Sequence, residues 1–158
     1  GIMVPTTSAP IFPTTTLEKR SSRLPPPKTD LPKIAYLISA HLTPPEKGAF
    51  DPTGLMRWHT CIFPAIRRMI PEPEPVYVVL LRNWTEKFEE LCLTDPNFKR
   101  LAHRIKPVYV DCLKDDKSPL SLCCKEEKGI LNFYDEFMFD EETGQAKYDW
   151  VGYQDDDT

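Results

Sequence analysis

Three consecutive aspartates, Asp155, Asp156 and Asp157, follow the segment YDWVGYQ at the end of the sequence. If the backbone stays extended there, Asp155 and Asp157 share one face and Asp156 points away, because side chains alternate along a strand. Two carboxylates about 4 Å apart repel by roughly 4 kcal/mol at an effective dielectric constant of about 20. We therefore expect a cation at Asp155 and Asp157, and carboxylate oxygens favour Mg²⁺, Mn²⁺ or Ca²⁺ over zinc. Such a site would bind a diphosphate; the alternative is a solvated acidic segment with no ligand.

The elements that must position these aspartates begin with four segments expected to form strands. Each segment is short, apolar and rich in β-branched or aromatic residues, as buried strands are. The segments are KIAYLISAH (33–41), PVYVVLL (75–81), KPVYVDC (106–112) and KYDWVGY (147–153). The last of them is the least regular, because Asp149 and Gly152 interrupt it.

Between these strands, apolar residues recur at steps of three and four, which indicates amphipathic helices. We expect helices from Asp51-Pro52 to residue 70, from the caps Asn83 and Thr85 through Leu91, from Asp95-Pro96 to residue 102, and over CKEEKGILNFYDEFMF (124–139). Pro119 is expected to lie in the loop before the last helix. Gly129 should weaken that helix near its start by about 1 kcal/mol relative to alanine.

Alternation of strands and helices predicts an α/β fold, with a Rossmann-like, mostly parallel sheet flanked by helices on its faces. Right-handed crossovers are the default connection in such a sheet. Ligands bind such sheets beyond the carboxyl ends of the strands. His41, Asn83, Asp111 and the terminal aspartates all fall at such ends.

The motif Asp155-x-Asp157 after DWVGYQ resembles the D-x-D motif of GT-A glycosyltransferases, which use nucleotide-sugar donors. The stretch from Lys125 through GILNFYDEF, then AKYDW and DDDT, is similar to the residues before the acidic motif in the fringe and beta-galactosyltransferase-like families. PKIAYLISAH resembles the first strand of the core-2 branching and xylosyltransferase group, which has no D-x-D there. The resemblance covers residues 32 to 158 and leaves the subfamily open.

The resemblance implies that Asp157 binds Mn²⁺ or Mg²⁺ directly and that Asp155 assists through the donor ribose or the metal. It implies that Ser39, Ala40 and His41 meet the nucleotide; for His41 the favoured alternative is a loop histidine with no ligand. The donor would be a nucleotide-sugar such as a UDP-sugar, and the acceptor a glycan or glycoprotein. The chain would then be the donor-binding half of the enzyme and inactive by itself, with the acceptor site and general base beyond it.

Two other functions fit parts of the same pattern. Haloacid dehalogenase-like phosphatases use D-x-D-x-T at a strand end, with the first aspartate as nucleophile. Here Thr158 comes one residue too early, and that motif follows the first strand of its sheet rather than the fourth. A non-catalytic α/β binding domain, or a transferase that has lost turnover, would keep the same sheet without the reaction.

Residues 1–31 are rich in Ser, Thr and Pro and carry no sustained apolar period. Such a segment cannot bury enough surface to offset its ordering entropy. We therefore expect a disordered linker or an O-glycosylated stem over residues 1–31, and one α/β domain over residues 32–158, truncated at its C-terminus.

The cysteines and a glycosylation motif bear on the cellular compartment. The five cysteines form no C-x-x-C pair and the three histidines lie far apart, so zinc is disfavoured. Cys61, Cys92 and Cys112 lie in apolar stretches, where buried free thiols are expected. A disulfide is possible in a secreted chain, with open connectivity. The tripeptide Asn83-Trp84-Thr85 is an N-glycosylation sequon and favours the secretory route.

Charge and hydropathy limit the partners further. The net charge is −4 and the basic residues are scattered, so we expect no nucleic-acid partner. No window approaches the roughly 18 apolar residues of a membrane span, so any membrane anchor is expected outside this chain. The resemblance to GT-A glycosyltransferases implies a full-length type II membrane protein of the Golgi or ER lumen; the alternative is a cytoplasmic protein.

Overall fold

The fold centres on a five-stranded sheet with the strand order β1-β5-β2-β3-β4. The computed structural model of the chain describes residues 1–5, 31–41, 52–113 and 118–156. The four expected strands are present as β2 (Ile34–Ser39), β3 (Val76–Leu81), β4 (Ile105–Val110) and β5 (Trp150–Asp155). Their pairings, β4 with β3, β3 with β2 and β2 with β5, are all parallel, so the expected mixed α/β architecture with a mostly parallel sheet is confirmed.

The fifth strand, β1 (Ile2–Pro5), lies in the segment that the sequence assigned wholly to a linker. It pairs antiparallel with β5, with Ile2 opposite Tyr153 and Val4 opposite Val151. The assignment was therefore wrong for residues 2–5, because a short apolar run can pair with a sheet edge without a helical or strand-like period of its own. Residues 6–30 lie outside the described part of the chain.

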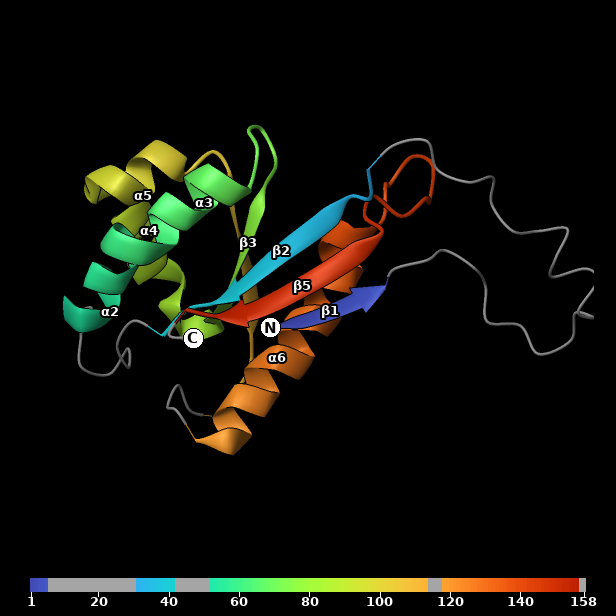
Figure 1. Ribbon diagram of the computed structural model, residues 1–158. Coiled ribbons are helices and arrows are strands. Elements are labelled where there is room, and N and C mark those ends of the chain that lie inside the picture. The colour runs from blue at the N-terminus through green and yellow to red at the C-terminus, as the bar shows by residue number, and fades with distance from the viewer. Residues whose placement is uncertain (6–30, 42–51, 114–117, 157–158) are drawn as a thin grey trace, which may run out of the picture.

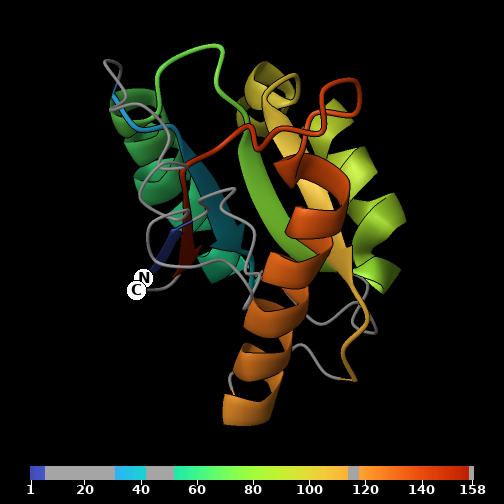
Figure 2. The same cartoon turned by 90° about the vertical axis from the view of Figure 1, so that its right-hand side faces the viewer.

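The helices cover both faces of the sheet (Figures 1 and 2). One face carries α2 (Pro52–Arg57), α3 (Phe63–Met69), α4 (Thr85–Thr94) and α5 (Pro96–Leu101), and the other carries α6 (Pro119–Phe133). The chain steps from β2 to β3 to β4 in one direction and then returns past β2 to β5. Crossovers of one hand place helices on opposite faces when the direction reverses. No helix within these described ranges has both the length and the apolarity to cross a bilayer.

A π-helical turn, η2 (Trp58–Ile62), joins α2 to α3 without a break. The N–H of Phe63 bonds to the carbonyl of Trp58, five residues back. Pro64 follows, and a proline in a regular helix would lose a hydrogen bond and clash with the carbonyl four residues earlier. The wider turn accommodates Pro64, and Trp58 at the start of the turn is fully buried. The N-cap expected at Asp51 falls outside the described residues.

Helix α6 begins earlier than the sequence predicted. Ser118 caps it by accepting a hydrogen bond from the N–H of Ser121, and Pro119 occupies the first turn rather than a loop. Proline is favoured there because the first helical N–H groups need no intrahelical partner. Gly129 therefore lies in the helix interior, where an added Cβ would be 2.9 Å from Cγ1 of Val79 on β3. The helix continues as a π-helical turn, η4 (Tyr134–Met138).

The other predicted helix starts differ in how they are capped. Asp95 accepts hydrogen bonds from the N–H groups of Asn97 and Phe98, so the start at Asp95-Pro96 is confirmed. Neither Asn83 nor Thr85 caps α4. A 3₁₀ turn, η3 (Arg82–Trp84), leads into that helix, and the Thr85 hydroxyl donates to the carbonyl of Arg82 instead.

The cysteines also depart from the sequence prediction. Cys112 forms a disulfide with Cys124 of α6 rather than remaining a free thiol. Cys61 is free, as expected, but exposed rather than buried. Cys92 is half-buried and free, and burial, with a contribution from Glu89, raises its pKa to about 11.

Candidate functional site

The candidate site lies where β2 and β5 end side by side. Ser39 pairs with Asp155 at the last register position of the two strands. The N–H of Asp156 then donates to the carbonyl of Ser39 at 3.0 Å, and the N–H of Ala40 donates to Val79 of β3 at 3.1 Å. The sheet therefore holds the predicted nucleotide-binding segment and the start of the acidic triplet next to each other.

Asp156 is the most heavily bonded residue of this site. Its Oδ2 accepts hydrogen bonds from the backbone N–H of His41 at 2.8 Å and from the indole Nε1–H of Trp58 at 2.9 Å. Its Oδ1 lies 3.4 Å from Nδ1 of His41 and 3.6 Å from Nη2 of Arg57. Arg57 also donates to the carbonyl of His41 at 3.3 Å. One buried carboxylate thus joins the end of β2, the helix after it and the end of β5.

These donors control the ionisation of Asp156. Its side chain is fully buried, and burial alone would raise its pKa. Hydrogen bonds from the side chain and backbone of His41 and from Trp58 outweigh that effect and hold the pKa of Asp156 below its ordinary value. Asp156 is therefore an ionised carboxylate at neutral pH, with its oxygens directed at protein donors.

A second buried charge approaches the same strand end from the opposite face of the sheet. Lys125 of α6 has no exposed surface, and its Nζ donates to the carbonyl of Ala40 at 2.6 Å. Tyr153 of β5 and Ser39 are also buried. Burial raises the pKa of the Tyr153 phenol, the Ser39 hydroxyl partly offsets this, and the charges of Asp155 and Glu126 add to the rise.

The structure brings some of the predicted site residues together and does not describe others. Ser39, Ala40, His41 and Asp155 are brought together as expected, at the ends of two neighbouring strands. The backbone does not stay extended through the triplet, because β5 ends at Asp155 and Asp156 lies in a turn. Asp157, the predicted direct metal ligand, is outside the described residues. Within the described ranges, no three His, Cys, Asp or Glu side chains form a group that could hold a metal ion.

Three contributors to the site were not singled out from the sequence, namely Arg57, Trp58 and Lys125. Trp58 stood in the apolar stripe of its helix, and its polar Nε1–H was the signal that a buried acceptor had to exist. Lys125 is a charged residue beside the apolar face of its expected helix, and nothing in the sequence indicated that its side chain is buried. Asp156 had no role assigned beyond pointing away from its neighbours.

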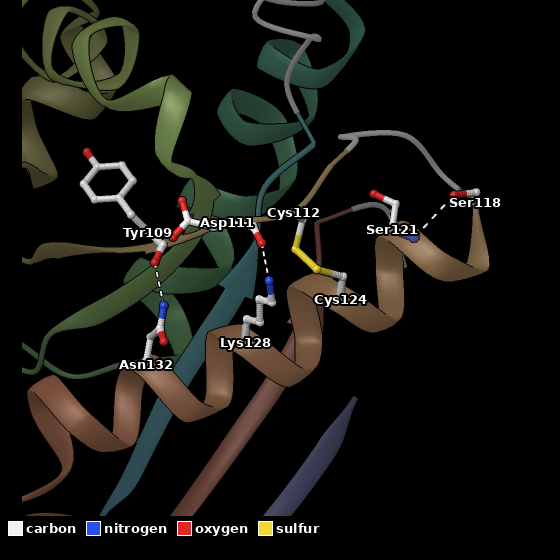
Figure 3. The surroundings of a disulfide bond; sticks show 8 residues. All are labelled: Tyr109, Asp111, Cys112, Ser118, Ser121, Cys124, Lys128 and Asn132. Atoms are coloured by element: carbon white, nitrogen blue, oxygen red, sulfur yellow. Dashed lines mark hydrogen bonds between the residues drawn. A yellow bond between two sulfur atoms is a disulfide. The ribbon is translucent and has the colours of Figure 1, made fainter.

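The other polar residues at strand ends form a separate group. Nε of Arg82, after β3, lies 3.0 Å from Oδ1 of Asp111, after β4, and both side chains are more than half exposed. Nζ of Lys128 in α6 donates to the backbone carbonyl of Asp111 (Figure 3). These contacts tie β3, β4 and α6 together and do not reach the ends of β2 and β5.

An open hollow of about 480 Å³ lies at the opposite edge of the sheet. It is lined by the residues before β2 and β3 and by the loop before β5, including Lys33, Glu74 and Tyr148. The amino ends of parallel strands meet there, whereas ligands of such sheets bind at the carboxyl ends. We therefore place the candidate site at the ends of β2 and β5. Comparison with family models, with curated proteins and with solved structures finds no match to this chain.

Proposed function

We propose that this chain is the donor-binding half of a GT-A-fold glycosyltransferase, a metal-dependent enzyme that transfers a sugar from a nucleotide diphosphate to a glycan or protein acceptor. The observation that carries the proposal is the position of the acidic triplet in the sheet. The order β4-β3-β2-β5 reverses direction between β2 and β5, and the triplet begins at that reversal. In open α/β sheets, nucleotides bind in the crevice outside the strand ends at such a switch point.

The donor atoms at the switch point suit a divalent cation bound to phosphate. Asp155 ends β5 with its side chain partly exposed, and its carboxylate is a hard oxygen donor of the kind that Mn²⁺ and Mg²⁺ prefer. Asp155 and Asp157 would hold the metal, which would neutralise negative charge on the leaving diphosphate. Asp156 is excluded from that role by its burial and by its bonds to His41 and Trp58.

The chain's own residues would bind and orient the donor. Ser39, Ala40 and His41 form the segment that would meet the nucleotide, and three ties fix its backbone: Asp156 to His41, Lys125 to Ala40, and Asp156 to Ser39. A site held by such bonds before the ligand arrives loses less entropy on binding. The buried charge of Lys125 beneath the end of β2 also favours an anionic ligand there.

The test is calorimetric titration of UDP into this chain with and without Mn²⁺. We expect binding that requires the metal and that weakens at least about tenfold in Asp155→Asn and Asp157→Ala, since each removes a charged ligand. Asp135→Asn, which changes an exposed aspartate of η4, is the matched control and should bind as the parent does. Metal-independent binding would favour a non-catalytic nucleotide-binding domain, and no binding of UDP with or without Mn²⁺ would refute a UDP-sugar donor.

A further inference from the structure

Asn83, Trp84 and Thr85 form an N-x-T tripeptide at the exposed turn between β3 and α4. Asn83 is exposed, and within the described residues its side chain makes no hydrogen bond that modification would break. The other two asparagines of the chain are followed by Phe-Lys and Phe-Tyr, so Asn83 carries the single sequon of the sequence. An N-x-T tripeptide with a residue other than proline in the middle is an acceptor for N-linked oligosaccharide.

A disulfide elsewhere in the fold independently indicates the cellular compartment in which N-glycosylation occurs. Cys112, directly after β4, is joined by a disulfide to Cys124 of α6 (Figure 3). Disulfides persist in the secretory pathway and are rare in the reducing cytosol. N-glycosylation acceptors belong to surface loops of secreted proteins. The disulfide and the exposed sequon therefore indicate the same route.

The folded turn would hide part of the sequon from a modifying enzyme. The hydroxyl of Thr85 donates to the carbonyl of Arg82 at 2.6 Å, and the N–H of Thr85 bonds to the same oxygen. The Trp84 side chain is 2% exposed. A transferase that must bind an extended tripeptide and its hydroxyl would have to unfold η3 and the start of α4. Modification must accordingly precede the folding of this turn.

We propose that Asn83 is an N-glycosylation site, modified while the turn is still unfolded. The amide nitrogen Nδ2 forms a bond to the anomeric carbon of an oligosaccharide carried on a lipid diphosphate. That carbon's bond to the diphosphate oxygen breaks, Nδ2 loses a proton, and the lipid diphosphate leaves. The inference depends on the compartment and the turn and does not rest on the proposed transferase function.

Asn83 lies at a different strand end from the candidate site. Asn83 follows β3, and the adjacent Arg82 is paired with Asp111 after β4. The candidate site lies on the other side of β2, between β2 and β5. Neighbouring strands are about 4.8 Å apart, and β3 is two strands from β5, so Asn83 lies roughly 10 Å from β5 across the sheet. The attachment atom is therefore not part of the candidate site.

The experiment is translation of the full chain, behind a cleavable signal peptide, in a reticulocyte lysate with microsomes, followed by gel electrophoresis with and without an endoglycosidase. We expect one slower, endoglycosidase-sensitive band, which Asn83→Gln and Thr85→Ala abolish and Thr85→Ser retains. Thr85→Ala also removes the hydrogen bond from Thr85 to the carbonyl of Arg82. Asn83→Gln keeps that bond, so loss of the band in Asn83→Gln cannot be due to its removal. Absence of the band, or its persistence in Asn83→Gln, overturns the site.

The timing is tested by offering purified oligosaccharyltransferase and lipid-linked donor to the purified chain in two states. The oxidised, folded chain should remain unmodified, and the chain reduced and unfolded in urea, then diluted into the reaction, should be modified at Asn83. Deamidation by peptide N-glycosidase in heavy-oxygen water locates the site by mass spectrometry. Equal modification of both states would refute modification before folding.

Discussion

Trp58 and Asp156, 98 residues apart in the chain, are joined by a hydrogen bond of 2.9 Å from the indole Nε1–H to the carboxylate Oδ2. Both side chains are buried, and the bond links the π-helical turn after α2 to the turn after β5. The same oxygen accepts the N–H of His41. One ionised group thus connects the ends of β2 and β5 with the helical segment that contains Trp58.

Replacing Asp156 should destabilise the domain. Asp156→Ala leaves the buried donors of Trp58 and His41 without an acceptor, and each unsatisfied buried donor costs about 1–3 kcal/mol. We expect a loss of about 3 kcal/mol in the free energy of unfolding, measured by urea denaturation followed by tryptophan fluorescence. Asp135→Ala, on the exposed side of η4, should change it by less than about 0.5 kcal/mol. Equal effects of the two variants would contradict the role given to Asp156.

The lowered pKa of Asp156 predicts a pH dependence of stability. Its pKa is lower in the folded chain than in the unfolded chain, so its contribution is complete above the unfolded value of about 3.9 and declines as the pH falls through the folded value. The difference in unfolding free energy between the parent and Asp156→Asn should therefore be constant from neutral pH to about pH 5 and shrink below about pH 4. A difference that persists unchanged into strong acid would show that the carboxylate charge is not what stabilises this turn.

Strands and the architecture of the sheet were predictable because buried parallel strands are continuous apolar runs, and their alternation with helices leaves few topologies. Every residue of VYVVLL, which forms β3, is buried. The start of α6 was missed because Pro119 was taken as a loop residue, although proline after a serine cap equally begins a helix. Strand β1 was missed because its pairing partner, β5, lies about 150 residues away.

The proximity of the candidate residues was predictable, whereas ligand binding there stays a prediction. The carboxyl ends of parallel strands lie at one edge of the sheet, so Ser39, His41 and Asp155 were expected near one another, and they are. The role of Asp156 depends on Trp58, whose burial the helical spacing predicts but whose hydrogen-bond partner, 98 residues away in the sequence, it does not reveal. Alternation along a strand predicts side-chain direction only while the backbone remains extended. Here the extended backbone ends at Asp155, so the alternation does not predict the direction of Asp156.

Arg104 should be more important to stability than its position in a loop suggests. It is 2% exposed, and its guanidinium donates to the carbonyls of Ile70, Pro71 and Glu74, which form the connection from α3 to β3. Lysine cannot reproduce this planar fork of donors. Arg104→Lys should lower the unfolding free energy by about 2 kcal/mol in urea titrations.

The matched control for Arg104 is Arg82→Lys, because Arg82 forms an ion pair that is more than half exposed. Exposed pairs contribute at most about 1 kcal/mol. We expect Arg104→Lys to lower the free energy of unfolding more than Arg82→Lys does. A larger loss of unfolding free energy for Arg82→Lys would mean that the carbonyl contacts of Arg104 contribute little.

Removing the disulfide should destabilise the attachment of α6 to β4. Cys112 and Cys124 are 12 residues apart in sequence, and closing a loop of about this size is worth roughly 3 kcal/mol. The double variant Cys112→Ser/Cys124→Ser should lose about that much stability under oxidising conditions, and a reducing agent should cause the same loss in the parent. Cys123→Ser, at an exposed free cysteine next in the chain, should be neutral. Insensitivity of the parent to reduction would refute the bond.

Gly129→Ala has two opposing effects on stability. The sign of the change in the free energy of unfolding indicates how closely α6 approaches the sheet. Alanine gains about 1 kcal/mol of helix propensity. Its Cβ, however, would lie 2.9 Å and 3.0 Å from the two methyl carbons of Val79, which is closer than carbon atoms approach in well-packed interiors. Overpacking of this kind costs about 1–3 kcal/mol, so we expect a net loss of about 1 kcal/mol in thermal and urea unfolding.

Val79 supplies the control for this close approach. Val79→Ala alone should destabilise the chain, because it removes two fully buried methyl groups from β3. In the Val79→Ala background, however, the alanine at position 129 no longer meets those methyl groups, and its helix propensity should make the substitution neutral or stabilising. A double-mutant cycle measures this coupling directly. If Gly129→Ala has the same effect in both backgrounds, the contact between α6 and β3 is not what requires glycine.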